Sequence, residues 1–375
     1  MKILFVGDVM PGGVLPYQKR YIDEALKEYM EGFDLRIGTL ECAIGTHIPP
    51  APEKLKENGG NNNVCFARDE DFFRIKELGF NVMSLGNNHS FDLGESGLKN
   101  TIRRLEENGI GYMGAGMNKQ EAAKPYVIEQ EGGVSFCIIA CCINGLSPRS
   151  LIVATEDSYG VYQPTIDELL SQIHSLRGKY DHTIVMPHWG EEHMFFPPYK
   201  CVEYAQMMID AGADAIFGSH SHVLSSNINY KGKIIYFGMG NYLNPDKCLT
   251  PPRPFFYPKS AEELKKMPRC INYPHSVRQK TILVSSEDAR IGIGVAVDIT
   301  KDRIKTKRFL VHNGNDNVLR FYKKDSWIKN ILLNNILIPL FNLNTHPWLY
   351  RFSRHLIGRL SLLRLKRLGD FKKDI

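Results

Sequence analysis

Short apolar runs alternate with amphipathic segments along the first part of the chain. The apolar runs have the length of buried strands and lie at 2–6, 34–40, 81–85, 134–140, 183–186 and 215–217. The segments between them repeat apolar residues at helical spacing, and the expected helices span 69–78, 97–107, 165–176 and 199–211. Gly79 follows the first of these helices and Asn108-Gly109 the second, and both are common helix stops. Strands that alternate with helices predict an α/β fold built in layers.

The pattern changes in the last part of the chain. Four more strands are expected, with no helix between them, at 233–237, 280–285, 291–299 and 304–310. They predict a second, partly antiparallel sheet. Two segments rich in Pro, Gly or Asn, 49–63 and 244–273, are expected to be irregular. Loops of this length are more often functional or mobile than inert.

The C-terminal segment has a character of its own. Residues 330–350 carry no charge, but Asn and Pro interrupt them, which is unfavourable for a membrane span. Beyond them Phe352, Leu356, Leu360 and Leu363 share one helical face, with most basic residues off it. Such a helix either lies on an anionic membrane or packs on the protein with a solvated basic face. We expect one domain at 1–315 and a basic helical tail at 316–375, with 351–375 as the candidate peripheral membrane contact.

Composition and charge narrow the classes of partner. The 375 residues are 43% hydrophobic and 23% charged, which is typical of a globular protein with a substantial core. Residues 351–375 hold eight basic and two acidic residues, a difference equal to the whole net charge of +6. The rest of the chain is neutral by count, so no nucleic-acid partner is expected.

Cysteine usage and the N-terminus bear on location. The eight cysteines form no CxxC pair and no regular framework, so free thiols in a reducing compartment are expected. The chain runs from Met1 directly into a strand, and its apolar run is too short for a secretory signal. We expect a cytoplasmic protein, with peripheral contact at the inner face of the membrane.

Residues that ligate metals follow several of the expected strands. They are Asp8, Glu41, Asn88, His188, His220 and His222. An α/β scaffold brings the ends of its strands to one edge, and this donor set suits two divalent metals. Taken singly, each residue has a structural alternative, such as a turn Asp, a surface Glu or a satisfied His. Taken together they predict a two-metal phosphoesterase, since paired metals polarise phosphate and activate water.

Individual residues suggest particular roles. Glu41 is the candidate bridging carboxylate, and Asn88 can ligate through its carbonyl oxygen. His89 lies beside the expected metals and is suited to protonating a leaving oxygen, with Asp92 fixing its tautomer. An Asx turn with a structural His is the alternative. Trp189 is either a wall of a substrate pocket or a core residue.

These motifs, taken in order, resemble a known family. They are Gly7-Asp8-Val9-Met10, Leu40-Glu41, Asn87-Asn88-His89-Ser90-Phe91-Asp92-Leu93-Gly94, Gly114-Ala115-Gly116, His188-Trp189-Gly190-Glu191-Glu192, Gly218-Ser219-His220-Ser221-His222-Val223 and Gly240-Asn241-Tyr242. As a set they resemble the bacterial capsule-synthesis CapA (PgsA-like) family, a branch of the calcineurin-like metallophosphoesterases. The match covers residues 1–242 and, more loosely, 280–310.

The resemblance implies a fold, a site and a role. The fold would be a four-layer α/β/β/α sandwich with a dinuclear site for Mn, Fe or Zn. By motif position the six residues named above are its ligands, and His89 with Asp92 forms the general acid. The implied substrate contacts are Asn87, Trp189, Glu192 and Asn241. The implied role is poly-γ-glutamate or other capsule production, with an anionic polymer or phosphoester substrate and other capsule-synthesis proteins as partners.

The chain departs from the family pattern at two positions. Ser219 stands where family members often have a His, and Met10 stands where many phosphoesterases have a further His ligand. Two other hypotheses therefore stand beside hydrolysis. One is a non-catalytic, metal- and polymer-binding component of a capsule assembly machine. The other is a peripheral membrane protein that acts through its tail.

Overall fold

The computed structural model describes residues 1–46, 64–143, 152–250, 255–271 and 279–322. Its largest sheet has eight strands in the order β21-β20-β19-β1-β2-β5-β6, with β15 pairing beside β1. Their bounds are β1 Lys2–Val9, β2 Leu35–Leu40, β5 Val82–Ser84, β6 Gly111–Met113, β15 Asn241–Leu243, β19 Ile291–Thr300, β20 Arg303–Asn313 and β21 Leu319–Phe321. Strands β1, β2, β5 and β6 run parallel, so their carboxyl ends share one edge.

A second sheet packs against the first. Its six strands have the order β13-β14-β12-β11-β9-β8. Their bounds are β8 Tyr126–Glu129, β9 Ser135–Cys142, β11 His182–His188, β12 Ala215–Phe217, β13 Asn227–Tyr230 and β14 Lys233–Tyr236. Strands β9, β11, β12 and β14 are parallel, so this sheet also gathers carboxyl ends at one edge.

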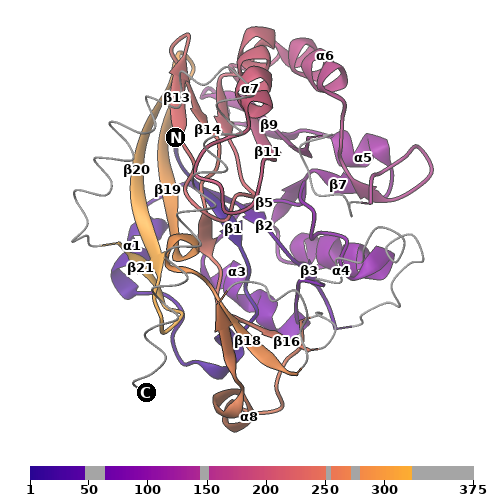
Figure 1. The fold of residues 1–375 in the computed structure, drawn as a ribbon. Helices are drawn as coiled ribbons and strands as arrows, with labels where there is room; N and C mark the ends of the chain where they lie inside the picture. The colour runs from indigo at the N-terminus through magenta and orange to yellow at the C-terminus, as the bar shows by residue number, and fades with distance from the viewer. Residues whose placement is uncertain (47–63, 144–151, 251–254, 272–278, 323–375) are drawn as a thin grey trace.

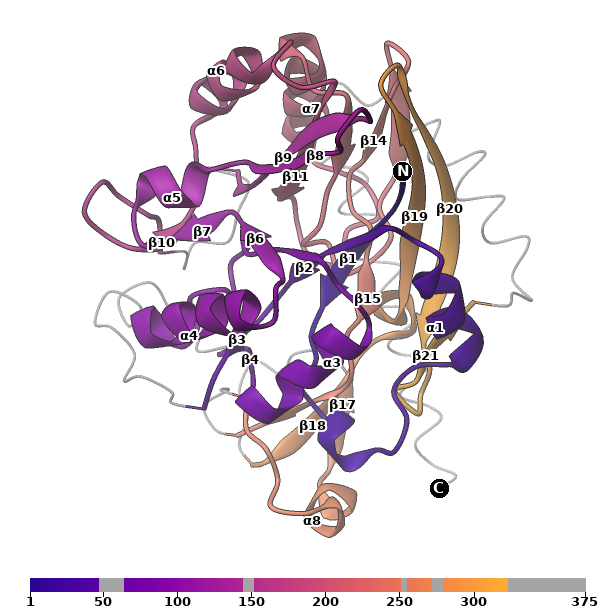
Figure 2. The ribbon, with the colours of Figure 1, turned by 180° about the vertical axis from the view of Figure 1, so that it is seen from behind.

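Helices cover the outer face of each sheet (Figures 1 and 2). Those on the first sheet are α1 Glu24–Glu31, α3 Phe73–Glu77 and α4 Gly94–Glu107. Those on the second are α5 Lys119–Ala123, α6 Ile166–Leu176 and α7 Tyr199–Ala211. Short 3-10 helices lie at Leu15–Tyr17, Asp69–Phe72 and Glu287–Arg290.

The alternation of side chains along the strands explains the layers. In β1, Ile3 and Phe5 face the second sheet, whereas Leu4 and Val6 face the helices of the first. Phe5 stacks on Phe217 of β12, with ring centroids 4.2 Å apart. Because successive residues of a strand point to opposite faces, a strand apolar on both sides must be covered on both sides. The expected four-layer α/β/β/α sandwich is confirmed.

A smaller sheet closes the end of the molecule opposite α6 and α7 (Figure 1). It consists of β16 Lys247–Leu249, β17 Arg269–Ile271 and β18 Thr281–Val284, next to α8 Ala261–Lys266. Two further strand pairs are β3 Ala43–Ile44 with β4 Phe66–Ala67, and β7 Ala115–Gly116 with β10 Gly160–Val161. The expectation that 244–273 is irregular is therefore wrong for its described part.

The expected second sheet of C-terminal strands is also wrong. β19 pairs antiparallel with β1 and β20 pairs with β19, so these strands extend the first sheet. β14 joins the second sheet and β18 the small one. Alternation fixes which face of a strand is buried but does not choose its neighbour. β21 continues the first sheet past the expected boundary at residue 315, and the expected tail helix at 351–375 lies outside the described residues.

Within the described ranges, no helix has both the length and the apolar composition that a membrane crossing requires. All eight cysteines are free thiols, and all except Cys270 are buried.

Strands β1 and β15 approach most closely at Gly7. A Cβ on Gly7 would lie 2.0 Å from the carbonyl oxygen of Gly240, and Asp8 N donates to that same oxygen at 3.1 Å. The contact sets Asp8 beside Asn241 in the sheet register. Only a residue without a side chain permits this approach.

We expect Gly7→Ala to lower the free energy of unfolding by about 1–3 kcal/mol or more, because the new methyl group forces two strands apart. Urea denaturation measures the effect. Gly32→Ala is the matched control, since its Cβ would make only an ordinary contact of 3.4 Å. Equal stability of the Gly7 and Gly32 variants would contradict the close approach.

Candidate metal centre

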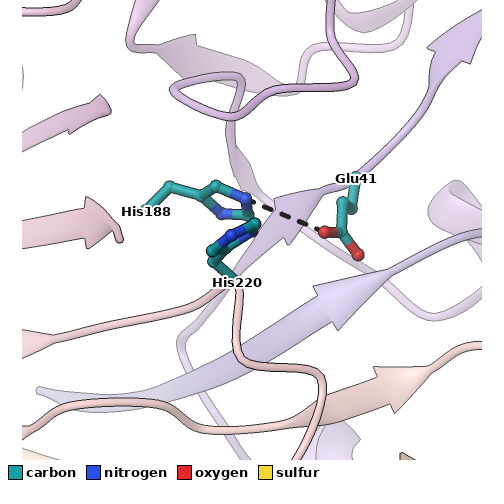
Figure 3. A group of neighbouring side chains, drawn as sticks. All are labelled: Glu41, His188 and His220. Atoms are coloured by element: carbon teal, nitrogen blue, oxygen red, sulfur yellow. Dashed lines mark ion pairs between the residues drawn. The ribbon is translucent and has the colours of Figure 1, made fainter. Parts of the chain in front are cut away.

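Residues from both sheets meet where the parallel strands end. Among the described residues, three groups of metal-ligating residues each have their ligand atoms within 4.8 Å of one another, and two of these groups contain Glu41. One group is Glu41, His188 and His220, and the other is Asp8, Glu41 and His222. Figure 3 shows the Glu41 carboxylate directed toward the His188 and His220 rings. The first sheet thus supplies carboxylates and the second supplies imidazoles.

The two oxygens of Glu41 face different groups. Oε1 lies 3.8 Å from His188 Nε2, and Oε2 lies 3.4 Å from His222 Nδ1. The same His222 nitrogen is 3.7 Å from Asp8 Oδ2. Asn88 Oδ1 lies 2.7 Å from His188 Nε2, so its carbonyl oxygen belongs to the first group. This is the arrangement of a carboxylate shared between two cation sites.

The buried oxygen and nitrogen atoms of this site are suited to binding divalent cations, because several of them form no hydrogen bond with one another. Asp8 is 1% and Glu41 5% exposed. Both Asp8 carboxylate oxygens, Glu41 Oε1 and His220 Nδ1 are buried without a hydrogen-bond partner among the described residues. Buried polar atoms normally have partners, and an unpaired buried carboxylate is costly. Oxygen and imidazole donors together suit Mn, Fe or Zn.

Burial also sets the protonation of these groups. It lowers the pKa of His220 to about 3 and the pKa of His188 and His222 well below the ordinary value. The imidazoles are therefore neutral at pH 7, which is the form that binds metals. Burial raises the pKa of Asp8 to about 7, and burial together with the Asp8 charge raises the pKa of Glu41.

The loop after β12 places two histidines in the left-handed region. His220 has φ 94° and His222 has φ 56°, values uncommon for residues other than glycine. In an extended chain, residues two apart would share a face, whereas this loop sends the rings to different groups. Gly218 begins the turn. A Cβ at this position would lie 2.3 Å from Phe237 O, so the turn requires a glycine here. Such strain is typical of functional sites.

Two of the expected substrate contacts form hydrogen bonds beside the ligand groups. Asn241 Oδ1 lies 3.0 Å from His222 Nδ1, and its amide nitrogen donates to Ala289 O at 2.8 Å. Asn87 donates to Leu40 O at 2.8 Å and accepts from His89 N at 3.0 Å. Both side chains are thus engaged within the protein, and the expected roles of Asn87 and Asn241 as substrate contacts stay predictions.

Trp189 is a core residue. It is 1% exposed, and its indole N–H donates to Phe237 O at 3.0 Å. Trp189 also lines a small pocket with Met194 and Phe196, so its interpretation as a pocket wall stays a prediction. Glu192 is exposed on the loop after β11, where its charge acts on Asp8 and His220, and it stays a candidate substrate contact.

His89 and Asp92 form the expected pair, with a third member that the motifs did not identify. His89 Nδ1 lies 2.7 Å from Asp92 Oδ2, and His89 Nε2 lies 3.8 Å from Cys65 Sγ. Cys65 N donates to the same Asp92 oxygen at 2.6 Å. Burial lowers the pKa of His89, but Cys65 and Asp92 outweigh it and hold the pKa well above its usual range. His89 is thus poised to carry a proton.

The structure accounts for both departures from the family pattern. Ser219 Oγ lies 2.8 Å from His188 Nδ1, so it orients this ring and leaves Nε2 facing Glu41. Met10 is 2% exposed and packs in the core beneath the first sheet, where it can contribute no nitrogen ligand.

Fold and site together define a four-layer α/β/β/α protein with a candidate two-metal centre at its strand ends. The chain belongs to the family described as bacterial capsule synthesis protein PGA_cap, whose model matches residues 2–246. This confirms the family expected from the motifs.

Individual proteins show the same likeness. The chain is 31% identical over 253 residues to "Capsule biosynthesis protein CapA" of Bacillus anthracis, covering 65% of this chain and 59% of that protein. It is 25% identical over 247 residues to "PGA biosynthesis protein CapA" of Bacillus subtilis, covering 64% and 62%. The chain therefore spans about three fifths of the length of these relatives. A phosphatase from Mycoplasma pneumoniae superposes with a TM-score of 0.46 at 15% identity, covering 83% of this chain and 93% of that one.

Metal binding should depend on pH with a definite sign. The raised pKa of Asp8, about 7, means that the metal-free folded protein holds a proton there below neutral pH. A group whose pKa is raised on folding stabilises the fold at low pH, and that stability is lost as the pH rises through the folded value. We expect Mn²⁺ to raise the Tm more at about pH 8 than at about pH 5.5. At the higher pH the Asp8 carboxyl has already lost its proton, so Mn²⁺ displaces none when it binds.

Differential scanning calorimetry across this range measures the effect. Asp8→Asn should flatten the pH dependence of the metal-induced shift. An equal Tm shift at both pH values in the unaltered protein would contradict the assignment of Asp8.

Ser219→Ala removes the partner of His188 Nδ1 and leaves every expected ligand in place. Loss of such an orienting partner typically weakens metal affinity by about 10- to 100-fold. Titration with Mn²⁺ measures this, with Ser175→Ala on the exposed side of α6 as the control. Unchanged affinity in Ser219→Ala would show that His188 needs no such support.

Proposed function

We propose that this protein is a two-metal phosphoester hydrolase that acts in the production of a capsule or related polymer. The observation that carries the proposal is that the two oxygens of Glu41 face different histidine groups, at 3.8 Å and 3.4 Å. A buried carboxylate without a partner is unfavourable, and a pair of metals at its two oxygens would offset that cost.

Each residue then has a role. Asn88, His188 and His220 would hold one metal with Glu41, and Asp8 and His222 would hold the other with Glu41. When bound, such metals polarise a phosphoryl oxygen and supply hydroxide at neutral pH. Ser219 fixes the orientation of the His188 ring through Nδ1, so that Nε2 faces Glu41.

His89 would donate the proton that the leaving oxygen needs. Its Nδ1 is engaged by Asp92 at 2.7 Å, so the proton would be given from Nε2, which lies 3.8 Å from Cys65 Sγ. It follows the ligand Asn88 directly in the chain, and its charge acts on Asp8, Glu41 and all three ligand histidines. A positioned acid of this kind contributes about 10²- to 10⁴-fold to a rate.

The polymer context comes from the family and from the names of the relatives, which refer to capsule and PGA biosynthesis. A second candidate function is a metal-dependent binding component without turnover. Met10 favours it, because this buried thioether leaves one metal with fewer protein ligands.

Two substitutions separate metal binding from proton transfer. His220→Ala should lose bound metal and turnover together, because it removes a ligand. His89→Asn should keep the metal and lower kcat by about 10²- to 10⁴-fold. Elemental analysis and assays with a phosphomonoester and a phosphodiester provide the two readouts.

His174→Asn, on the exposed face of α6, is the control and should match the unaltered protein. Turnover that survives in both His220→Ala and His89→Asn would rule out hydrolysis at this centre. Metal-dependent polymer binding without any turnover would instead support the second candidate.

A further inference from the structure

Lys247 is a half-buried lysine that no motif singles out. It is the first residue of β16, in the small sheet. Among the described residues its ammonium donates to Asn244 Oδ1 and takes part in no ion pair. A lysine that is partly desolvated without a carboxylate partner is uncommon in a structural role, since burying an unpaired charge is unfavourable.

The pleat of β16 shows which way Lys247 faces. Cys248 packs with Val14 and Ile282 on one side of the strand, and Leu249 packs on the other, in the core that contains Cys65. Residues two apart in a strand share a face, so Lys247 lies on the side of Leu249 and Cys65.

Neighbouring segments connect this face to the metal centre. Leu249 forms an isolated β-bridge with Phe255. The N–H of Phe255 donates to Val64 O at 3.1 Å, and Val64 precedes Cys65 in the chain. Cys65 in turn lies 3.8 Å from His89.

The charge of Lys247 acts on the group formed by Asp8, Glu41 and His222. Burial raises the pKa of Asp8 and of Glu41, and the Lys247 charge opposes that rise at each. Burial lowers the pKa of His222, and Lys247 lowers it further. Together with the face that Lys247 shares with Leu249 and Cys65, this places the cation on the side of the metal centre.

A buried polar network fixes the chain around Lys247. Asp246 forms an ion pair with Arg290 at 2.8 Å, and its N–H donates to Asn317 Oδ1 at 2.7 Å. Arg290 also donates to Gly314 O at 2.9 Å. At the other end of the segment, Asn241 is in register with Asp8. The segment from Asn241 to Lys247 is thus held by the ligand strand on one side and by a fully buried ion pair on the other.

We propose that Lys247 is the anion-recognition residue of this centre, whose ammonium binds an oxyanion of the substrate beside the metal ligands. The inference rests on the proposed function for its phosphoester and deepens it by naming a specificity residue. An ammonium has three donors, and among the described residues Asn244 takes one, which leaves two for phosphoryl or carboxylate oxygens. A compact, half-buried ammonium recognises such oxygens as a point charge.

The test compares Mn²⁺-loaded protein with Lys247→Met and Lys247→Arg, using isothermal titration with inorganic phosphate and, separately, glutarate. We expect Lys247→Met to weaken binding by roughly 10- to 100-fold, with metal content unchanged, and Lys247→Arg to retain part of it. Lys280→Met is the matched control, because Lys280 adjoins β18 of the same sheet and pairs with Glu263 at 3.0 Å, exposed to solvent.

The two anions identify the source of the oxyanion. Weakened binding of phosphate alone assigns Lys247 to the phosphoryl group, and weakened binding of glutarate alone assigns it to a carboxylate. Unchanged affinity for both anions in Lys247→Met, or no binding of either by the unaltered protein, would overturn the proposal. Binding needs no turnover, so a protein that binds anion through Lys247 without hydrolysis would contradict the proposed function and leave the role of Lys247 standing.

Discussion

Two buried carboxylates, Asp8 and Glu41, constrain the rest of this structure. They sit at the ends of adjacent parallel strands, because β1 and β2 pair in register up to Val9 and Leu40. Each is nearly inaccessible to solvent, faces neutral imidazoles and, among the described residues, forms no ion pair with a lysine or an arginine. Isolated ionised carboxylates in such surroundings are strongly unfavourable, and divalent cations between them and the imidazoles would remove that cost.

The sandwich explains how the ligands come together. Neither sheet carries a complete set, since the first sheet ends in Asp8, Glu41 and Asn88 and the second in three histidines. The apolar layer between the sheets, with Phe5 stacked on Phe217, holds the two half-sites at a fixed separation. The backbone at His220 and His222 is in the left-handed region, and surrounding contacts hold it there. One such contact is the close approach of Gly218 to the carbonyl oxygen of Phe237. Metal binding and folding are therefore expected to be coupled.

Most of the elements and the ligand set could be predicted from the sequence, because buried strands leave clear apolar runs and the ligands follow them directly. Helix α7 and strand β12 have the predicted bounds, Tyr199–Ala211 and Ala215–Phe217. The partners of β19 and β20 could not be predicted, since alternation does not specify which strand edge they meet.

The residues that surround the metal ligands could not be predicted from the sequence either. Lys247 and Cys65 follow no ligand motif, and both reach the centre only through tertiary packing of β16 against residues 64–66. Trp189 and Asn87 lie inside conspicuous motifs, yet their hydrogen bonds to Phe237 and Leu40 give them structural roles. Motif position identifies a loop that matters, and only the hydrogen-bond partners show which of its residues remain available to a ligand.

The central claim is that Glu41 is shared between two metals. Anomalous diffraction at the manganese edge, from crystals grown with Mn²⁺, tests it most directly. The account predicts two peaks, each at roughly 2.0–2.2 Å from a different oxygen of Glu41. No peak at Glu41, or one metal alone bound at Cys65, His89 and Asp92, would contradict it.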